Sequence, residues 1–270
     1  MRRPVVRDAA VAGLFYPADP QVLRATVDAL LAAVPPAPAG SVPKAVIVPH
    51  AGYVYSGSTA ALAYARLAPG RGAVRRAVVV GPTHRVAVRG VALPGADVFD
   101  TPLGPVRVPE GWARERLADL PVVRVFPLTH AQEHSVEVQL PFLQRVLGDI
   151  EVVPLLDGDA SGEEVAEVLD ALWGGPETVV VISSDLSHYL PYDEARAMDA
   201  RTIAQIMALD GPLDHRQACG ATPVNGMLVA AARHGLRPEL LGACSSGDTA
   251  GDRDRVVGYC AIAFGADDDA

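Results

Sequence analysis

Runs of consecutive apolar residues recur along the chain, and most of them end at a polar group. Four runs cover residues 44–49, 75–81, 150–156 and 178–184, and a fifth, 256–264, lies near the end of the sequence. A strand that is apolar without alternation is buried on both faces, as strands of helix-covered parallel sheets are. The pattern therefore predicts a set of buried, mainly parallel strands.

Segments with apolar positions at helical spacing alternate with these runs. The predicted helices cover residues 20–33, 57–68, 134–147, 161–173 and 193–209. Alternation of strand and helix is typical of βαβ units, so the sequence predicts an α/β fold with three layers, in which helices cover both faces of one mainly parallel sheet. The segment 90–109 interrupts the alternation and predicts a hairpin or excursion at one side of the sheet.

The length and composition favour a single domain. Of the 270 residues, 50% are hydrophobic, which is enough for a substantial core. The sequence has no repeat of fixed period and no long Gly/Ser linker, so we expect one α/β domain over residues 1–264. Residues 265–270 contain three aspartates and predict a solvated acidic tail.

Charge and cysteine content exclude several classes of partner. The formal net charge of −9 argues against nucleic acids and anionic membranes, because both require clustered cations. No apolar run reaches the roughly 18 residues of a membrane span, and Arg7 and Asp8 interrupt the amino-terminal segment before any signal-peptide core. The three cysteines form no CxxC pair, which favours a reducing environment over a disulfide framework. We therefore expect a cytoplasmic protein.

Histidines follow two of the predicted strands, His50 after the run 44–49 and His84 after the run 75–81. In open α/β sheets, ligands collect at the carboxyl ends of the strands. A single histidine at such a place is more often a hydrogen-bonded structural residue, but two of them could share one divalent cation if their strands are neighbours. Neutral imidazoles suit iron, copper, zinc or nickel rather than magnesium or calcium.

The loops after the strands carry further polar side chains. Tyr53 and Tyr55 could donate hydrogen bonds to a substrate, or could pack on the surface of a strand-to-helix turn. Asp185 precedes His188 by three residues, so its carboxylate could orient the imidazole or raise its basicity. Alternatively, Asp185 caps a helix and His188 is exposed.

The segment 129–137 gathers histidines and acids but does not match the HExxH motif of metalloproteases. On a helix, His134 and Glu137 would share a face, so a carboxylate could hold His134 as an acid/base group. Asp248 or Asp252, in the loop before the last predicted strand, could complete a metal site, although a loop aspartate more often caps a turn. The other histidines are interpreted as structural or surface residues: His130, His215 and His234.

Six motifs together resemble the Memo family, whose prokaryotic members include the B protein of the AmmeMemoRadiSam system. The motifs are His50-Ala51-Gly52-Tyr53-x-Tyr55-Ser56-Gly57, Gly81-Pro82-x-His84, Thr101-Pro102-Leu103-Gly104, Glu133-His134-Ser135-x-Glu137-x-x-Leu140-Pro141, Ser183-Ser184-Asp185-x-Ser187-His188 and Cys219-Gly220-x-x-Pro223. They extend over most of the chain, from about Val6 to Phe264. The resemblance implies a fold like that of the class III extradiol dioxygenases and a radical SAM protein as a partner. It also implies a pocket lined by His50, His84, His134, Asp185 and His188.

The resemblance further implies roles for single residues. In the dioxygenases, the histidines that match His50 and His84 bind iron with a glutamate, and the histidine that matches His188 acts in acid/base chemistry. Eukaryotic Memo members are associated with copper or iron held by two histidines and a cysteine near the carboxyl terminus. Counting back from Val257-Gly258-Tyr259 puts that cysteine position near Thr249, where the adjacent Asp248 could supply an oxygen ligand that favours iron over copper.

These observations lead us to expect a Memo-like, Fe(II)-dependent oxidoreductase or dioxygenase-like enzyme that acts on a small substrate, with copper or zinc as alternative metals. The expected metal ligands are His50, His84 and Asp248. His188, oriented by Asp185, would move a proton, and His134 would contact oxygen or substrate. The expected substrate contacts are Tyr53, Tyr55 and Glu133. Two alternatives are a non-catalytic protein that binds an anionic or phosphorylated peptide in the same pocket, and a metal-dependent hydrolase.

Overall fold

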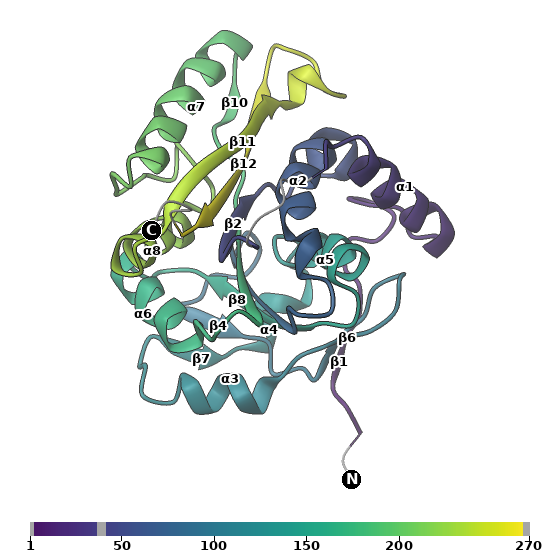
Figure 1. Cartoon of the computed structure of the whole chain (residues 1–270), viewed down its shortest axis with the longest axis vertical. Helices are drawn as coiled ribbons and strands as arrows, with labels where there is room; N and C mark the ends of the chain where they lie inside the picture. The colour runs from purple at the N-terminus through teal and green to yellow at the C-terminus, as the bar shows by residue number, and fades with distance from the viewer. Residues whose placement is uncertain (1–2, 37–41, 267–270) are drawn as a thin grey trace.

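The computed structural model describes residues 3–36 and 42–266. A parallel sheet forms its centre (Figure 1). Its four central strands lie in the order β8 (Glu151–Asp157), β3 (Arg76–Pro82), β9 (Thr178–Ser183) and β2 (Ala45–Val48), and each pair is parallel. These strands are the four central apolar runs of the sequence. The prediction of an α/β fold with a mostly parallel sheet is therefore confirmed.

Shorter and antiparallel strands extend this centre on both sides. Beyond β2, the strand β12 (Val256–Gly265) runs antiparallel and pairs in turn with β11 (Arg237–Ser245) and β10 (His188–Leu190). Beyond β8 lie β6 (Val106–Arg107), β5 (Val98–Phe99) and β1 (Val6–Arg7), while β4 (Val91–Leu93) joins β8 to β7 (Val123–Val125). The segment 90–109 thus contains the predicted excursion, with β5 and β6 as an antiparallel pair.

Helices cover both faces of the sheet. One face carries α1 (Pro20–Ala32), α2 (Tyr53–Leu67) and α5 (Leu140–Leu147), and the other carries α6 (Gly162–Leu172), α7 (Tyr192–Met207) and α8 (Ala221–Arg233). The short helices are α3 (Glu110–Arg116), α4 (Pro127–Ala131), η1 (Ala68–Gly70), η2 (Glu137–Gln139) and η3 (Ser246–Asp248). Within the described ranges, no helix combines the length and apolar character needed to cross a membrane.

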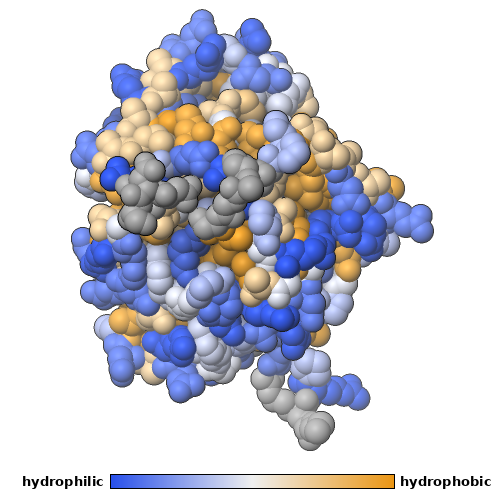
Figure 2. All heavy atoms as spheres, viewed as in Figure 1, coloured by the Kyte–Doolittle hydropathy of each residue, from blue (hydrophilic) through white to orange (hydrophobic). Residues whose placement is uncertain are grey.

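Strand β2 explains why the central runs are apolar without alternation. Val46 and Val48 pack into the core under α1, α2 and α5, whereas Ala45 and Ile47 pack into the core under α6, α7 and α8. All four side chains are almost fully buried. At the surface, by contrast, Figure 2 shows hydrophilic residues over most of the periphery and hydrophobic residues gathered toward the middle of the face in view.

The helix predicted over 134–147 is shorter than expected. It begins as the 3₁₀ turn η2 and becomes α-helical only at Leu140, where Pro141 suits the first turn because it has no N–H to satisfy. Upstream, the Glu133 carboxylate accepts the backbone N–H groups of His134 and Ser135, so these residues form a loop. Conversely, α2 begins at Tyr53, four residues before the predicted start, and α8 and β11 were not predicted.

The last strand is slightly longer than the sequence predicts. The last strand extends to Gly265, one residue into the predicted acidic tail, and residues 267–270 of that tail lie outside the described residues.

Near the amino-terminal end, Arg7 forms a buried ion pair with Glu137 and also donates from Nε to the carbonyl of His130, at 3.0 Å. Glu137 therefore serves the amino-terminal segment and does not hold His134 as expected.

The same carboxylate accepts three further hydrogen bonds from the amino-terminal segment. The backbone N–H groups of Ala10 and Val11 donate at 2.8 and 3.0 Å, and the Tyr16 hydroxyl also donates. Glu137 is 0% exposed. These contacts fix residues 7–16 against the segment that carries Glu133 and His134.

We expect Glu137→Ala to lower the free energy of unfolding by about 3–5 kcal/mol, because it leaves Arg7 buried without its partner. Urea denaturation of the variant and of the unchanged protein measures this loss. The control is Glu239→Ala, which removes an ion pair with Arg66 in which the Glu239 side chain is 57% exposed, and which should cost about 0–1 kcal/mol. Equal losses in both variants would contradict the anchoring role of Glu137.

Candidate functional site

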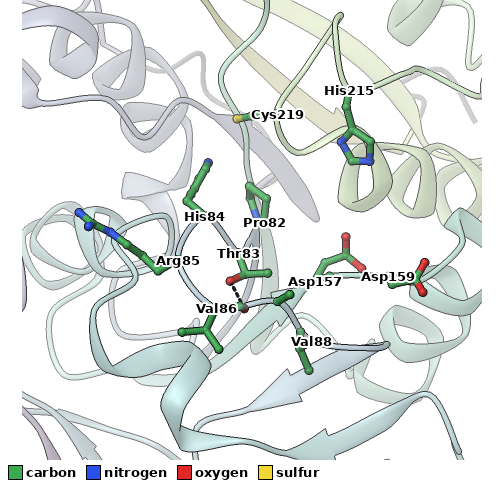
Figure 3. Close-up of a pocket in the computed structure, with 12 residues that line it drawn as sticks. Pro82, Thr83, His84, Arg85, Val86, Val88, Asp157, Asp159, His215 and Cys219 are labelled. Atoms are coloured by element: carbon green, nitrogen blue, oxygen red, sulfur yellow. Dashed lines mark hydrogen bonds between the residues drawn. The ribbon is translucent and has the colours of Figure 1, made fainter.

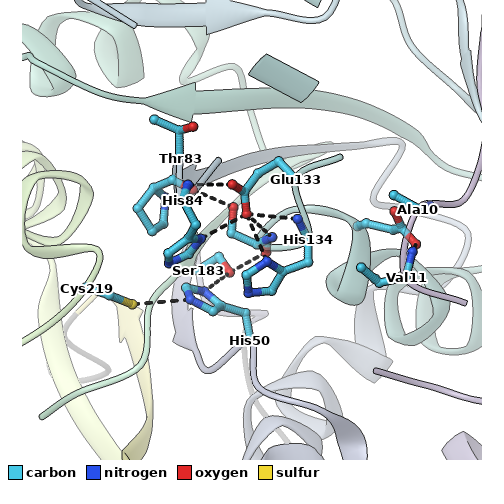
Figure 4. Close-up of polar contacts among 12 residues, drawn as sticks. Ala10, Val11, His50, Thr83, His84, Glu133, His134, Ser183 and Cys219 are labelled. Atoms are coloured by element: carbon cyan, nitrogen blue, oxygen red, sulfur yellow. Dashed lines mark hydrogen bonds and ion pairs between the residues drawn. The ribbon is translucent and has the colours of Figure 1, made fainter. Parts of the chain in front are cut away.

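Three histidines meet at the carboxyl edge of the central strands (Figure 4). His50 lies two residues beyond β2, and His84 lies two residues beyond β3. Their ring centroids are 5.2 Å apart, and the ring of His134 lies 5.4 Å from His50 and 4.7 Å from His84. Because β2 and β3 both pair with β9 in parallel, their exits lie at the same edge of the sheet.

A cysteine joins the first two histidines. The Sγ atom of Cys219 lies 3.2 Å from Nε2 of His50. One ligand atom from each of His50, His84 and Cys219 lies within 4.8 Å of the others. We call these three residues the histidine–cysteine cluster.

Asp248, the third ligand expected from the sequence, lies elsewhere. Its carboxylate accepts the backbone N–H and the hydroxyl of Ser245, at 2.9 and 3.0 Å, and the hydroxyl of Tyr192. Among the described residues, the groups whose ligand atoms converge do not include Asp248. The place expected for it is taken by Cys219, which the sequence already presents in the motif Cys219-Gly220-x-x-Pro223.

Gly220 allows the cysteine to approach the strand ends. A Cβ atom at this position would lie 2.8 Å from Oγ of Ser184 and 2.9 Å from the carbonyl oxygen of Ser183, closer than packed atoms come. The Gly220 N–H donates to Ser184 Oγ at 3.0 Å, and the Cys219 N–H donates to the carbonyl of Asp185 at 3.3 Å. The loop before α8 is thereby held against the end of β9.

Hydrogen bonds determine which nitrogen of His50 carries the proton. Its Nδ1 lies 2.9 Å from Oγ of Ser183, whose own hydroxyl proton goes to the carbonyl of Ser135 at 2.6 Å. Ser183 Oγ also accepts from Gln139 Nε2, which must be the donor end because it donates to the Pro49 carbonyl as well. His50 Nδ1 is therefore a donor, and the lone pair lies on Nε2, which faces Cys219.

Glu133 sets the same arrangement in His84. Its carboxylate lies 2.9 Å from His84 Nδ1 and also accepts the backbone N–H groups of His84, His134 and Ser135. Burial alone would raise the pKa of Glu133, but the neighbouring His134 and His84 hold it far below its ordinary value. Glu133 is thus a carboxylate that receives Nδ1–H of His84 and leaves Nε2 free to bind a metal. It is 2% exposed, so it is placed to support the ring rather than to contact a substrate.

In the metal-free cluster, the ring of His50 is ready to bind a metal ion, whereas the thiol of Cys219 must first lose its proton. Burial and the nearby His134 and His84 lower the pKa of His50 well below its ordinary value, so its ring is neutral. Burial and Asp185 raise the pKa of the Cys219 thiol to about 12. A bound cation would supply the positive charge that this thiolate lacks, because metal ligation requires neutral imidazole and deprotonated sulfur.

A large cavity of about 1250 Å³ opens beside the cluster. His188 lies on its wall, with Nδ1 2.8 Å from the carbonyl oxygen of Leu186, so that Nε2 carries the lone pair. Asp185 also borders the cavity, but its carboxylate accepts the backbone N–H of His50 at 2.7 Å. Burial raises the pKa of Asp185. The orientation of His188 is therefore set by a backbone carbonyl, whereas Asp185 holds the loop of His50.

The two tyrosines predicted to contact a substrate are placed differently. Tyr55 borders the large cavity and is 39% exposed. Tyr53 is buried, donates its hydroxyl proton to the carbonyl of Val138 at 2.7 Å, and packs with its ring centroid 5.0 Å from that of Phe142. The structure does not bring Tyr53 to the cavity.

The three remaining histidines also differ in position. His130 is buried and bonded through Nε2 to the carbonyl of Ala92, at 2.9 Å. His234 stacks on Trp173 at the surface. His215, which the sequence was taken to place among structural or surface residues, lines the large cavity. Its position in the loop before Cys219 is the one sequence feature that points to this location.

The model of the family described as "Memo-like protein" matches residues 7–263. The chain belongs to the Memo family. A MEMO1 family protein from Sulfolobus acidocaldarius is 34% identical over 284 residues, which cover 97% of this chain and 100% of that protein. Memo relatives from Methanopyrus kandleri and Aquifex aeolicus are 36% and 34% identical and also cover 96% of this chain. The family resemblance of the sequence is confirmed over nearly the whole chain.

The hydrogen bonds predict that His50 and His84 are Nδ1–H tautomers in the metal-free protein, which ¹⁵N NMR of the imidazole nitrogens measures. Glu133→Gln should remove this preference in His84 but not in His50, because only His84 depends on Glu133. Glu110→Gln makes the same change in α3, where Glu110 pairs with Arg114, and is the control that should alter neither ring. An unchanged His84 tautomer in Glu133→Gln would contradict the role of Glu133.

Proposed function

We propose that this Memo-family chain is a metal-dependent oxidoreductase in which His50, His84 and Cys219 hold one iron or copper ion. The observation that carries this proposal is the convergence of one ligand atom each from His50, His84 and Cys219 within 4.8 Å. Imidazole binds iron, copper and zinc, and thiolate adds a soft ligand that magnesium and calcium do not take. The set of donors therefore fits a transition metal.

The replacement of Asp248 by Cys219 changes the choice of metal. An aspartate would have favoured iron, whereas a thiolate suits copper as well. When bound, such an ion would bring substrate and an oxidant together and exchange electrons with them. Zinc fits the same donors without redox chemistry, and for that reason marks the hydrolase alternative.

The surrounding residues support chemistry on a substrate in the large cavity. His188 Nε2 can accept a proton from a substrate hydroxyl, since its Nδ1–H is already bonded to the Leu186 carbonyl. His134 borders the same cavity beside His84 and is positioned to contact the substrate. Histidines that follow two parallel strands on either side of β9, with a further histidine for proton transfer, support the likeness to class III extradiol dioxygenases that the sequence implies.

The location and partners extend the proposal. Cys219, Cys244 and Cys260 are all free thiols, which supports a reducing compartment, and we place the protein in the cytoplasm. We keep the radical SAM protein of the AmmeMemoRadiSam system as the proposed partner.

One observation favours a binding function instead. Arg85, Arg216 and Arg255 all border the large cavity, where they could bind an anionic or phosphorylated peptide. This function requires binding without turnover, and the experiments below separate it from oxidation.

We expect Cys219→Ala to weaken binding of the metal by at least about tenfold, because it removes one of three donors. Elemental analysis after anaerobic reconstitution with Fe(II) or Cu(I), followed by chelator competition, measures this. Cys244→Ala is the matched control, since this second half-buried thiol bonds Thr59, and Asp248→Asn should also retain the metal. Full metal content in Cys219→Ala would disprove the assignment of the ligands.

We expect His188→Ala to keep the metal but to slow substrate-dependent oxygen consumption by about 10²–10⁴-fold, the usual contribution of a general acid or base. An oxygen electrode and a panel of catechols measure the rate for the iron-loaded protein. His234→Ala, at the surface against Trp173, is the control and should keep full activity. If the unchanged, metal-loaded protein consumes no oxygen with any catechol, extradiol chemistry is excluded and the binding function gains support.

A further inference from the structure

A second cavity, of about 580 Å³, lies at the carboxyl ends of β3 and β8 (Figure 3). Its lining includes His84 and Cys219 of the histidine–cysteine cluster, and also Asp157 and Asp159. Strand pairing fixes this neighbourhood, because Pro82 and Asp157 are partners at the ends of β3 and β8. We call this space the Asp157 cavity.

Asp157 is unusual because it is buried without a hydrogen-bond partner. The residue is 3% exposed, and its Oδ1 atom has no hydrogen-bond partner among the described residues. A buried polar atom left unpaired is costly, and such atoms often mark a place that a ligand completes. The oxidoreductase proposed above makes no use of this carboxyl group.

The charges around Asp157 are negative. Burial, together with Asp159 and Glu164, raises the pKa of Asp157 to about 8. Arg85 belongs to the lining, but Figure 3 shows its side chain pointing away from the two aspartates, whereas His215 borders the cavity near them. A positive group that entered the cavity would be attracted by the carboxylate of Asp159 and would favour the ionised form of Asp157, which burial otherwise disfavours.

We propose that the Asp157 cavity binds the ammonium group of a small molecule, held by the carboxyl groups of Asp157 and Asp159. The volume lies within the range of cavities that hold small ligands, about 300–1,000 Å³. A metal cation is a weaker candidate, because among the described residues the groups with converging ligand atoms do not include Asp157 or Asp159.

The position of the cavity suggests what the bound molecule is. A ligand whose ammonium lies at Asp157 extends toward His84 and Cys219, which border both cavities. The cluster would therefore act on a substrate that carries an amine at one end. This last step rests on the proposed oxidoreductase function, whereas ammonium binding does not.

The test compares two probes that differ in charge, 4-fluorophenethylammonium and the neutral 2-(4-fluorophenyl)ethanol, by ¹⁹F NMR titration of the metal-free protein at pH 7. We expect the unchanged protein to bind the ammonium at least about tenfold more tightly than the alcohol. Asp157→Asn, which keeps the shape of the side chain, should reduce this preference to about twofold or less. Asp252→Asn removes one acid at the rim of the large cavity and should keep the preference.

The outcomes separate this inference from the proposed function. Equal binding of both probes to the unchanged protein overturns it, as does a preference that survives in both Asp157→Asn and Asp159→Asn. If Asp157→Asn does not fold, Asp159→Asn alone decides, because its exposed side chain can change without disturbing the core. A preference that is present in the metal-free protein, together with full metal content in Cys219→Ala, would uphold the ammonium site and reject the assigned metal ligands.

Discussion

The candidate site depends on one buried carboxylate, that of Glu133, which accepts hydrogen bonds from three residues in two loops. Glu133 accepts from the ring and backbone of His84 and from the backbone of His134 and Ser135. This single group orients the His84 ring, forms the loop that carries His134, and links that loop to the end of β3. Desolvating a carboxylate is unfavourable, and only this number of donors makes its burial tolerable.

Much of the fold could be predicted because burial on both faces leaves a simple mark in the sequence. The central strands are apolar at every position, and both cores use them, as Val46 and Ile47 show. The helix predicted to begin at His134 begins later, because hydrophobic periodicity carries no information on side chains that accept backbone N–H groups. Glu133 accepts those of His134 and Ser135 and so interrupts the helix. The helix α8 and the strand β11 lack the sharp polar boundaries that marked the other elements.

The site was only partly predictable for a related reason. His50 and His84 follow strands, so parallel pairing alone brings them to one edge. Cys219 comes from a loop between two helices, and its approach depends on Gly220 fitting against Ser184, a contact that no spacing rule encodes. Tyr53 and Tyr55 illustrate the same limit, since two positions in the first turn of α2 face different ways, so that one ring enters the core and the other lies at the cavity.

The order of the cluster residues along the chain has a consequence for how the protein matures. His50 and His84 leave the ribosome early, but Cys219 follows only after most of the polypeptide has been synthesised, and its loop must then dock against β9. An incomplete nascent chain therefore offers at most two of the three donors of the proposed metal centre. If the chain binds the proposed ion, the complete set of donors would form only after most of the polypeptide has been synthesised.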